Sequence, residues 1–275
     1  MGRDTAVDIG PCIRTELGES PLWSERRQRV FWVDTSGGFI HSLHPASGQT
    51  ASWATPAPIG MLAESPAGGL IAAIGNSLAK ISETGDLETV AHAPHGTPDT
   101  RLNDGVYDER GRLWIGLMHN DLEPGSGCLY CYTPDGQWHV MARGFTLING
   151  MAWLQSCREL VVTESRPGAL YRYEVDDPQR PLATPACMAQ ISPHLGYPDG
   201  LIRWRDDSFL SVLFDGAAIA EIDTACRQRR LISLPVSRPT SCVYVPALGR
   251  LFITSARLGL EQPSAQDGAL IALDM

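Results

Sequence analysis

Six short apolar runs recur along the 275-residue chain, each preceded by a polar or glycine-rich turn. The runs occupy residues 30–33, 70–74, 113–116, 160–163, 209–213 and 251–254. Short runs of aliphatic, aromatic and β-branched residues between such turns are typical of buried strands. Because no stretch has the length and periodicity of a long helix, the pattern predicts an all-β protein.

A small residue opens a second repeated segment ahead of each run. These small residues are Gly18, Gly60, Gly105, Gly150, Gly200 and Ser241. Successive repeats begin roughly 40 to 50 residues apart, which is the spacing of four-stranded propeller blades. The repeats therefore predict a six-bladed β-propeller with four-stranded antiparallel blades, formed by residues 1–275 as a single domain.

Strand-like segments are also present at both ends of the chain. They occupy residues 6–9 and 12–15 at the N-terminus and residues 268–274 at the C-terminus. A ring of blades has to close on itself, because an unpaired edge strand invites aggregation. We therefore expect the N-terminal strand to complete the final blade and to tie the two termini together.

Composition and charge restrict the functions that this fold could serve. Hydrophobic residues make up 43% of the chain and charged residues 19%, as in a soluble globular protein. The N-terminus lacks the apolar core of a signal peptide and no apolar run could cross a bilayer, so we expect a cytoplasmic protein. The net charge of -9 argues against nucleic acid or an anionic membrane as a partner and favours a bound cation. Basic residues cluster only at residues 227–230, where we expect a solvated hairpin.

The residues next to the repeated small residue offer a candidate metal site. Superposition of the repeats aligns Glu19, Ile59, Asp104, Asn149, Asp199 and Thr240. Equivalent points of the blades face the central channel, so carboxylate and amide oxygens from distant parts of the chain would converge there. Such oxygens suit a hard cation such as calcium, magnesium or manganese. Alternatively, Asp-Gly and Asn-Gly are ordinary turn dipeptides, and the pattern alone leaves both interpretations open.

Several motifs give the chain a resemblance to a known family over nearly its full length. They lie at residues 18–23, 101–105, 111–116, 149–153, 198–201 and 239–242. In this order and spacing they resemble the senescence-marker protein, gluconolactonase and regucalcin family of six-bladed propellers. The resemblance implies that Glu19, Asn149 and Asp199 bind one divalent ion, which could be calcium, zinc, magnesium, manganese or iron. It further implies that Arg101, Asn103 and Asp121 contact the substrate.

The chemistry of these residues is compatible with the hydrolysis of a sugar lactone. A cation with three protein ligands keeps open positions and can polarise a lactone carbonyl. Asp199 could take a proton from the attacking water as general base, while Arg101 fixes the sugar ring. No Gly-x-Ser-x-Gly motif is present, so direct attack by water is the simpler route.

Other functions of the same fold remain alternatives at this point. A propeller could serve as a non-enzymatic scaffold or calcium-binding protein, or as a metal-dependent esterase or phosphotriesterase. The polar residues predicted to contact substrate favour a small sugar lactone. A closed ring can act alone, so we expect a monomer or a weak oligomer.

Overall fold

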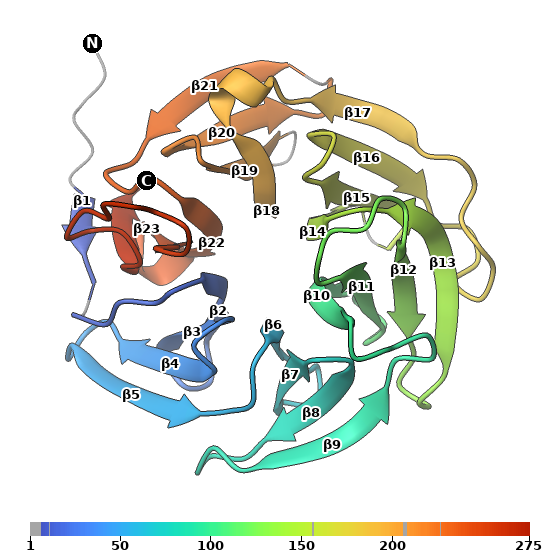
Figure 1. The fold of residues 1–275 in the computed structure, drawn as a ribbon, viewed down its shortest axis with the longest axis horizontal. Helices are drawn as coiled ribbons and strands as arrows, with labels where there is room; N and C mark the ends of the chain where they lie inside the picture. The colour runs from blue at the N-terminus through green and yellow to red at the C-terminus, as the bar shows by residue number, and fades with distance from the viewer. Residues whose placement is uncertain (1–6, 11, 156, 206–207, 226) are drawn as a thin grey trace.

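The computed structural model describes residues 7–10, 12–155, 157–205, 208–225 and 227–275. Six four-stranded antiparallel sheets stand around a common centre like the blades of a propeller (Figure 1). The predicted six-bladed, all-β architecture is confirmed. Two short 3-10 turns, η1 (Pro193–Leu195) and η2 (Pro246–Leu248), are the helical elements of the described part of the chain. None of the helices in that part is long and apolar enough to cross a membrane.

Each blade begins with its innermost strand and proceeds outward. The first blade contains β2 (Gly18–Ser24), β3 (Arg29–Asp34), β4 (Phe39–His44) and β5 (Gln49–Ala54). The second contains β6 (Ile59–Glu64), β7 (Leu70–Ile74), β8 (Ser77–Ile81) and β9 (Leu87–His92). The third contains β10 (Thr100–Tyr107), β11 (Leu113–His119), β12 (Gly127–Tyr132) and β13 (Trp138–Phe145).

The second half of the ring repeats this order. The fourth blade contains β14 (Ile148–Gln155), β15 (Glu159–Glu164), β16 (Ala169–Glu174) and β17 (Ala186–Gln190). The fifth contains β18 (Tyr197–Arg205), β19 (Ser208–Phe214), β20 (Ala218–Asp223) and β21 (Gln228–Ser233). The sixth contains β22 (Pro239–Val245), β23 (Arg250–Ser255), β24 (Ile271–Asp274) and β1 (Val7–Ile9).

The sixth blade closes the ring with strands from both ends of the chain. β1 pairs antiparallel with β24, which places Val7 opposite Leu273 and Ile9 opposite Ile271. The Gly10 N–H then donates to the Leu270 carbonyl at 2.8 Å and extends this pairing by one residue. The predicted closure by the N-terminal strand is confirmed, and it leaves no unpaired edge on β24.

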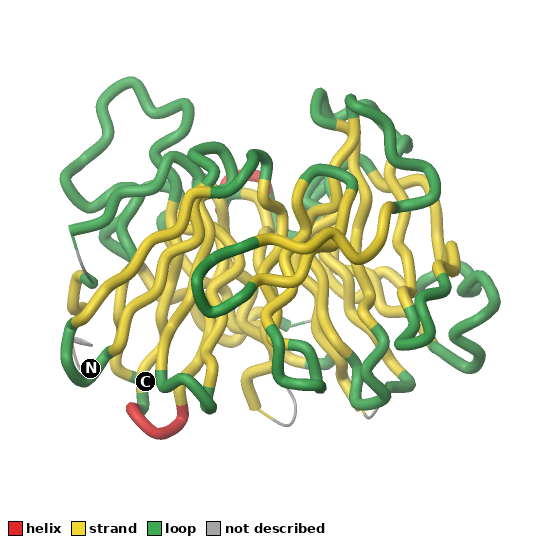
Figure 2. Tube along the Cα trace, turned by 90° about the horizontal axis from the view of Figure 1, so that it is seen from below, coloured by secondary structure: helices red, strands yellow, loops and turns green. Residues whose placement is uncertain are grey.

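The core lies between neighbouring blades, because each sheet packs a face against the next one. Trp114, Met118 and Leu129 of the third blade pack with Leu160 and Val162 of the fourth in one buried cluster. Middle strands are covered on both faces, which is why they read as continuous apolar runs in the sequence. Seen from the side, the strands run between two loop-bearing ends of the ring (Figure 2).

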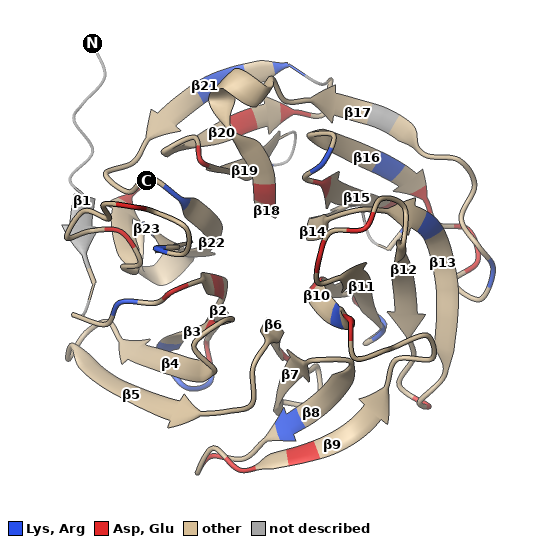
Figure 3. Cartoon of the chain, in the orientation of Figure 1, with Lys and Arg blue, Asp and Glu red and all other residues tan. Residues whose placement is uncertain are grey.

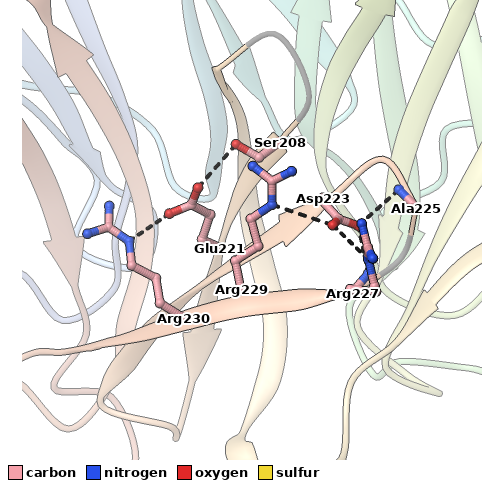
Figure 4. A network of polar contacts seen from close by, with 7 residues as sticks. All are labelled: Ser208, Glu221, Asp223, Ala225, Arg227, Arg229 and Arg230. Atoms are coloured by element: carbon pink, nitrogen blue, oxygen red, sulfur yellow. Dashed lines mark hydrogen bonds and ion pairs between the residues drawn. The ribbon is translucent and has the colours of Figure 1, made fainter.

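The basic residues of the predicted solvated hairpin are paired with acids of the adjacent strand. Asp223 accepts hydrogen bonds from the side chains of Arg227 and Arg229, and Glu221 accepts one from Arg230 at 2.6 Å (Figure 4). The Arg227 backbone and side-chain N–H groups lower the pKa of Asp223 below its usual range. These contacts make the basic run part of the fifth blade's outer surface, where each of the three arginines is paired with a carboxylate.

Candidate metal and substrate site

A cavity of about 300 Å³ gathers residues from the innermost strands of four blades. Five of the six residues predicted to bind metal or substrate line it, namely Glu19, Arg101, Asn103, Asn149 and Asp199. They come from β2, β10, β14 and β18, and Figure 3 shows acidic positions of β2 and β18 beside the central opening. A second cavity of about 310 Å³ lies between the first two blades and contains none of these residues.

Every innermost strand changes its pairing register at the same point of the repeat. The shifts lie between residues 19 and 22, 59 and 61, 102 and 105, 148 and 151, 198 and 201, and 239 and 242. Such bulges release residues from the ladder and re-aim their side chains. In their strands, Asn103, Asn149 and Asp199 are each the first residue released from the ladder. The same bulge therefore positions all three side chains.

This register corrects the sequence superposition at the first and third blades. In the first blade Glu19 stays paired with Val33 and directly precedes the released residues Ser20 and Pro21. In the third blade, the sequence superposition made Asp104 equivalent to Asn149 and Asp199. The strand pairing shows that Asn103 is the equivalent residue and that Asp104 corresponds to Gly150 and Gly200. The alternative interpretation as turn dipeptides is wrong, because these residues lie inside strands β10, β14 and β18.

The glycines serve close contact between neighbouring innermost strands. A Cβ on Gly150 would lie 2.2 Å from the Leu201 nitrogen, and one on Gly200 would lie 2.3 Å from Ser241 Oγ. Both distances are far below van der Waals contact, so only glycine allows this approach. The tight ring that results brings the oxygen atoms of adjacent blades together.

Burial and mutual repulsion dominate the electrostatics of the cavity. Burial raises the pKa of Glu19 well above its usual range, and the charges of Asp199 and Asp104 raise it further. The pKa of Asp199 is raised by burial and by Asp104, and burial raises the pKa of Asp104 to about 6. Ionising these three neighbouring acids together costs free energy unless a bound cation compensates their negative charge.

Hydrogen bonds hold the two amides of the cavity in a defined orientation. The Asn149 Nδ2 donates to Ser165 Oγ at 2.9 Å, which directs the Oδ1 atom the other way. Asn103 Nδ2 donates to this Oδ1 and to the Ile148 carbonyl at 2.9 Å. Because an amide oxygen has two lone pairs, one remains on Asn149 Oδ1 for a further partner.

The donor set fits a divalent ion bound by oxygen. The half-buried Glu19 and the buried Asp199, both with raised pKa values, and one oriented amide oxygen are hard ligands that a cation would stabilise in the ionised form. Within the described residues, no three His, Cys, Asp or Glu side chains form a ligand group. The predicted set does not require a third such side chain, since its third donor is the amide of Asn149.

Arg101 supplies a free donor to the same cavity. Its Nη1 donates to Asn120 Oδ1 at 3.0 Å, while its buried Nε has no hydrogen-bond partner. Burial lowers the pKa of the guanidinium and the Glu19 carboxylate opposes this effect. A guanidinium carries five N–H donors, so Arg101 keeps donors beyond the bond to Asn120 for a ligand oxygen in the cavity.

Asp121 lies apart from the other predicted residues. It is exposed and does not line the cavity, although its neighbours Asn120 and Leu122 do. Its backbone N–H donates to His119 Nδ1 at 3.2 Å. Contact between Asp121 and substrate therefore stays a prediction.

The cavity also contains residues that the sequence did not single out. Ser165 and Arg166 follow β15, and Tyr197 begins β18 directly before the motif at residues 198–201. Ser165 and Arg166 belong to no sequence motif, so only the folded structure shows that they line the cavity. For Tyr197, the adjacent motif was the one available signal.

Comparison with known proteins places the chain among propellers of similar length. It is 28% identical to a 6-deoxy-6-sulfogluconolactonase from Pseudomonas putida, over 91% of this chain and 86% of the relative. It is 25% identical to regucalcin from Xenopus laevis, over 91% and 88%. A pentonolactonase from Haloferax volcanii is also 25% identical, over 94% and 91%.

Solved structures share the fold. A regucalcin from Agrobacterium tumefaciens, described as a calcium-binding protein, superposes with a TM-score of 0.90 at 22% identity, over 98% of this chain and 93% of the other. The sequence profile of the SMP-30/Gluconolactonase/LRE-like region matches residues 17–257. The chain therefore belongs to the SMP-30, gluconolactonase and LRE-like family, as its motifs had indicated.

Proposed function

We propose that this protein is a metal-dependent lactonase that hydrolyses an aldonolactone to the sugar acid. The observation that carries the proposal is the convergence of Glu19, Asn149, Asp199, Arg101 and Asn103 on one cavity. The family relatives named 6-deoxy-6-sulfogluconolactonase and pentonolactonase support the same reaction class.

Glu19, Asn149 and Asp199 would hold the divalent ion. When bound, the ion would supply Lewis acidity that polarises the lactone carbonyl. The protein's own part is to bring two carboxylates and an amide oxygen together at the bulges of β2, β14 and β18. Its identity stays open among calcium, zinc, magnesium, manganese and iron, because oxygen ligands accept several divalent ions.

The remaining groups would position the substrate and move a proton. Asp199 acts as general base and removes a proton from the attacking water. Arg101 donates from its guanidinium to a substrate oxygen, and Asn103 lies two residues further along the same strand. Asp121 remains a proposed third contact that would require the loop after β11 to approach the substrate.

Calcium binding without turnover is the second candidate function. It is favoured by the similar structure of a regucalcin described as a calcium-binding protein. The guanidinium of Arg101 in the cavity lining favours a ligand in addition to the ion, because a cation cannot accept its hydrogen bonds.

A screen of five- and six-membered aldonolactones separates these functions. Acid release would be followed with each of the five divalent ions and after chelation. We expect turnover of at least one lactone that chelation abolishes and metal restores. Turnover that persists unchanged after chelation would refute the metal mechanism, and ion binding without any turnover would favour the second candidate.

A further inference from the structure

Arg166 is a charged group at the rim of the cavity that the proposed reaction does not use. It lines the same cavity as the proposed lactone-binding groups, and its side chain is exposed. Among the described residues, its guanidinium has neither a hydrogen bond nor an ion pair. The other arginines nearby are engaged, since Arg101 donates to Asn120 and Arg238 donates to Asp215 at 2.5 Å.

The turn that carries Arg166 is fixed on both sides. The neighbouring Ser165 accepts a hydrogen bond from Asn149 and donates to the Pro198 carbonyl at 2.6 Å. The following residue, Pro167, accepts a hydrogen bond from Gln190 Nε2 at 2.7 Å. Arg166 therefore extends from a segment tied directly to Asn149, a proposed ion ligand, and to Pro198, the residue before Asp199.

The side chain itself rests on an aromatic platform. The guanidinium carbon of Arg166 lies 5.4 Å from the centre of the Tyr197 ring, which also lines the cavity. A cation above an aromatic face is held by the ring's charge distribution and keeps its edge N–H groups free. This geometry presents a planar pair of donors to the cavity mouth, which suits the oxygens of an anionic group.

The charge of Arg166 also calls for an anion. Asp215, the carboxylate of the turn after β19 that lines the cavity, is already paired with Arg238. Arg166 then adds one positive charge that no described group compensates. A neutral lactone would leave this charge unused, whereas a lactone with an acidic substituent would neutralise it.

We propose that the substrate is an anionic sugar lactone whose charged substituent, distant from the lactone carbonyl, is bound by Arg166. The substituent is a carboxylate, a sulfonate or a phosphate, all of which accept two hydrogen bonds from a guanidinium. This inference rests on the proposed lactonase function, because it assigns the substrate class of the same cavity.

The test compares pairs of lactones that share a ring and differ in the terminal group. One member of each pair is neutral, and the other carries an anionic terminal group. Separate experiments use a carboxylate, a sulfonate and a phosphate as that group. We expect wild-type protein to prefer at least one anionic member in kcat/KM. In Arg166→Gln, the ratio of anionic to neutral kcat/KM should fall by about 10- to 100-fold, as for the loss of a charged hydrogen bond.

Two further variants separate charge from structure. Arg166→Lys keeps the charge without the planar fork and should retain part of the preference. The matched control is Arg110→Gln, which changes an exposed arginine in the β10–β11 turn outside the cavity and should leave the ratio unchanged. If Arg166→Gln lowers both kcat/KM values equally, or if wild type prefers neutral lactones in every arm, the inference is overturned.

A binding measurement distinguishes failure of this inference from failure of the lactonase function. Calorimetry on the ion-loaded protein would compare D-glucarate, which has carboxylates at both ends, with D-gluconate, which has one. We expect about tenfold tighter binding of glucarate in wild type and loss of that difference in Arg166→Gln. This result without lactone turnover would refute the lactonase and keep the anion site, whereas equal affinities for the two acids would refute the anion site.

Discussion

Asp199 performs two tasks in the proposed reaction, ion ligand and general base, and these tasks can be separated. In Asp199→Asn the side chain keeps an oxygen for the ion but cannot accept a proton at neutral pH. We expect turnover to fall by about a hundred- to ten-thousand-fold, the usual contribution of general-base catalysis. Ion binding, measured by calorimetry on the same preparations, should weaken less than in Asp199→Ala. An Asn variant that binds ion and keeps near-normal turnover would assign the base to another residue, with Asp104 or Asp121 next.

Asp104 allows a prediction about pH that does not depend on activity. An acid whose pKa is higher in the folded protein than in the unfolded chain binds its proton more tightly when folded. Burial raises the pKa of Asp104 from an ordinary 3.8 to about 6, and Glu19 and Asp199 shift in the same direction. The ion-free protein should therefore lose stability as the pH rises from about 4 through 6.

The measurement is the Tm of the chelated protein between pH 4 and 7. Asp104→Asn should remove part of the decrease, because the amide carries no titrating proton. The difference between the two proteins isolates Asp104 from groups such as His41, whose pKa is lowered by burial and which therefore acts in the opposite direction. Identical Tm profiles for wild type and Asp104→Asn would contradict the assigned shift.

The bulge in the innermost strand of a blade positions the side chains of the candidate site. It releases two residues from the ladder in β10, β14 and β18, and the first of them faces the cavity. The second position is glycine at Gly150 and Gly200, where neighbouring blades approach most closely. Site geometry and ring packing thus depend on the same two-residue segment.

Substitution of one of these glycines should destabilise the ring. In Gly150→Ala, the new Cβ would lie 2.2 Å from backbone nitrogen of Leu201, which cannot move without shifting β18. We expect a loss of about 1–3 kcal/mol in the free energy of unfolding, typical of overpacking, measured by denaturant titration. Gly69→Ala is the control, because a Cβ there meets no atom within 4 Å. Equal stabilities of the two variants would show that the inner strands can separate at little cost.

The fold and most of the candidate site could be predicted from the sequence, because both are built from repeated segments. The apolar runs became the second strands of the blades, and Glu19, Asn149 and Asp199 belong to motifs with a fixed place in the repeat. The one-residue errors at Glu19 and Asp104 arose because the sequence does not show which residues of a bulge are paired. Arg166 and Tyr197 could not be found together, since their contact joins a turn of the fourth blade to a strand of the fifth.

At the scale of the whole molecule, the ion and the fold should be separable. The blades are held by their own ladders and by apolar clusters between sheets, none of which includes the proposed ion ligands. Chelation should therefore leave the far-ultraviolet circular dichroism spectrum nearly unchanged and lower the Tm by a few degrees, in line with ligand linkage. Loss of the β-sheet signal on chelation would show instead that the ion holds the ring together.

The closure of the ring gives the last prediction, because it depends on few backbone contacts from one end of the chain. β1 pairs with β24 through three residues, Val7, Asp8 and Ile9, and the rest of the sixth blade comes from the C-terminal part of the chain. Deleting residues 1–9 should expose the edge of β24, lower the Tm and promote self-association, seen by light scattering. The proposed ion ligands lie on the first, fourth and fifth blades, so ion binding at low temperature should survive. Deletion of residues 1–6 keeps β1 and is the control; if both deletions behave alike, strand pairing at the closure contributes little to the stability of the ring.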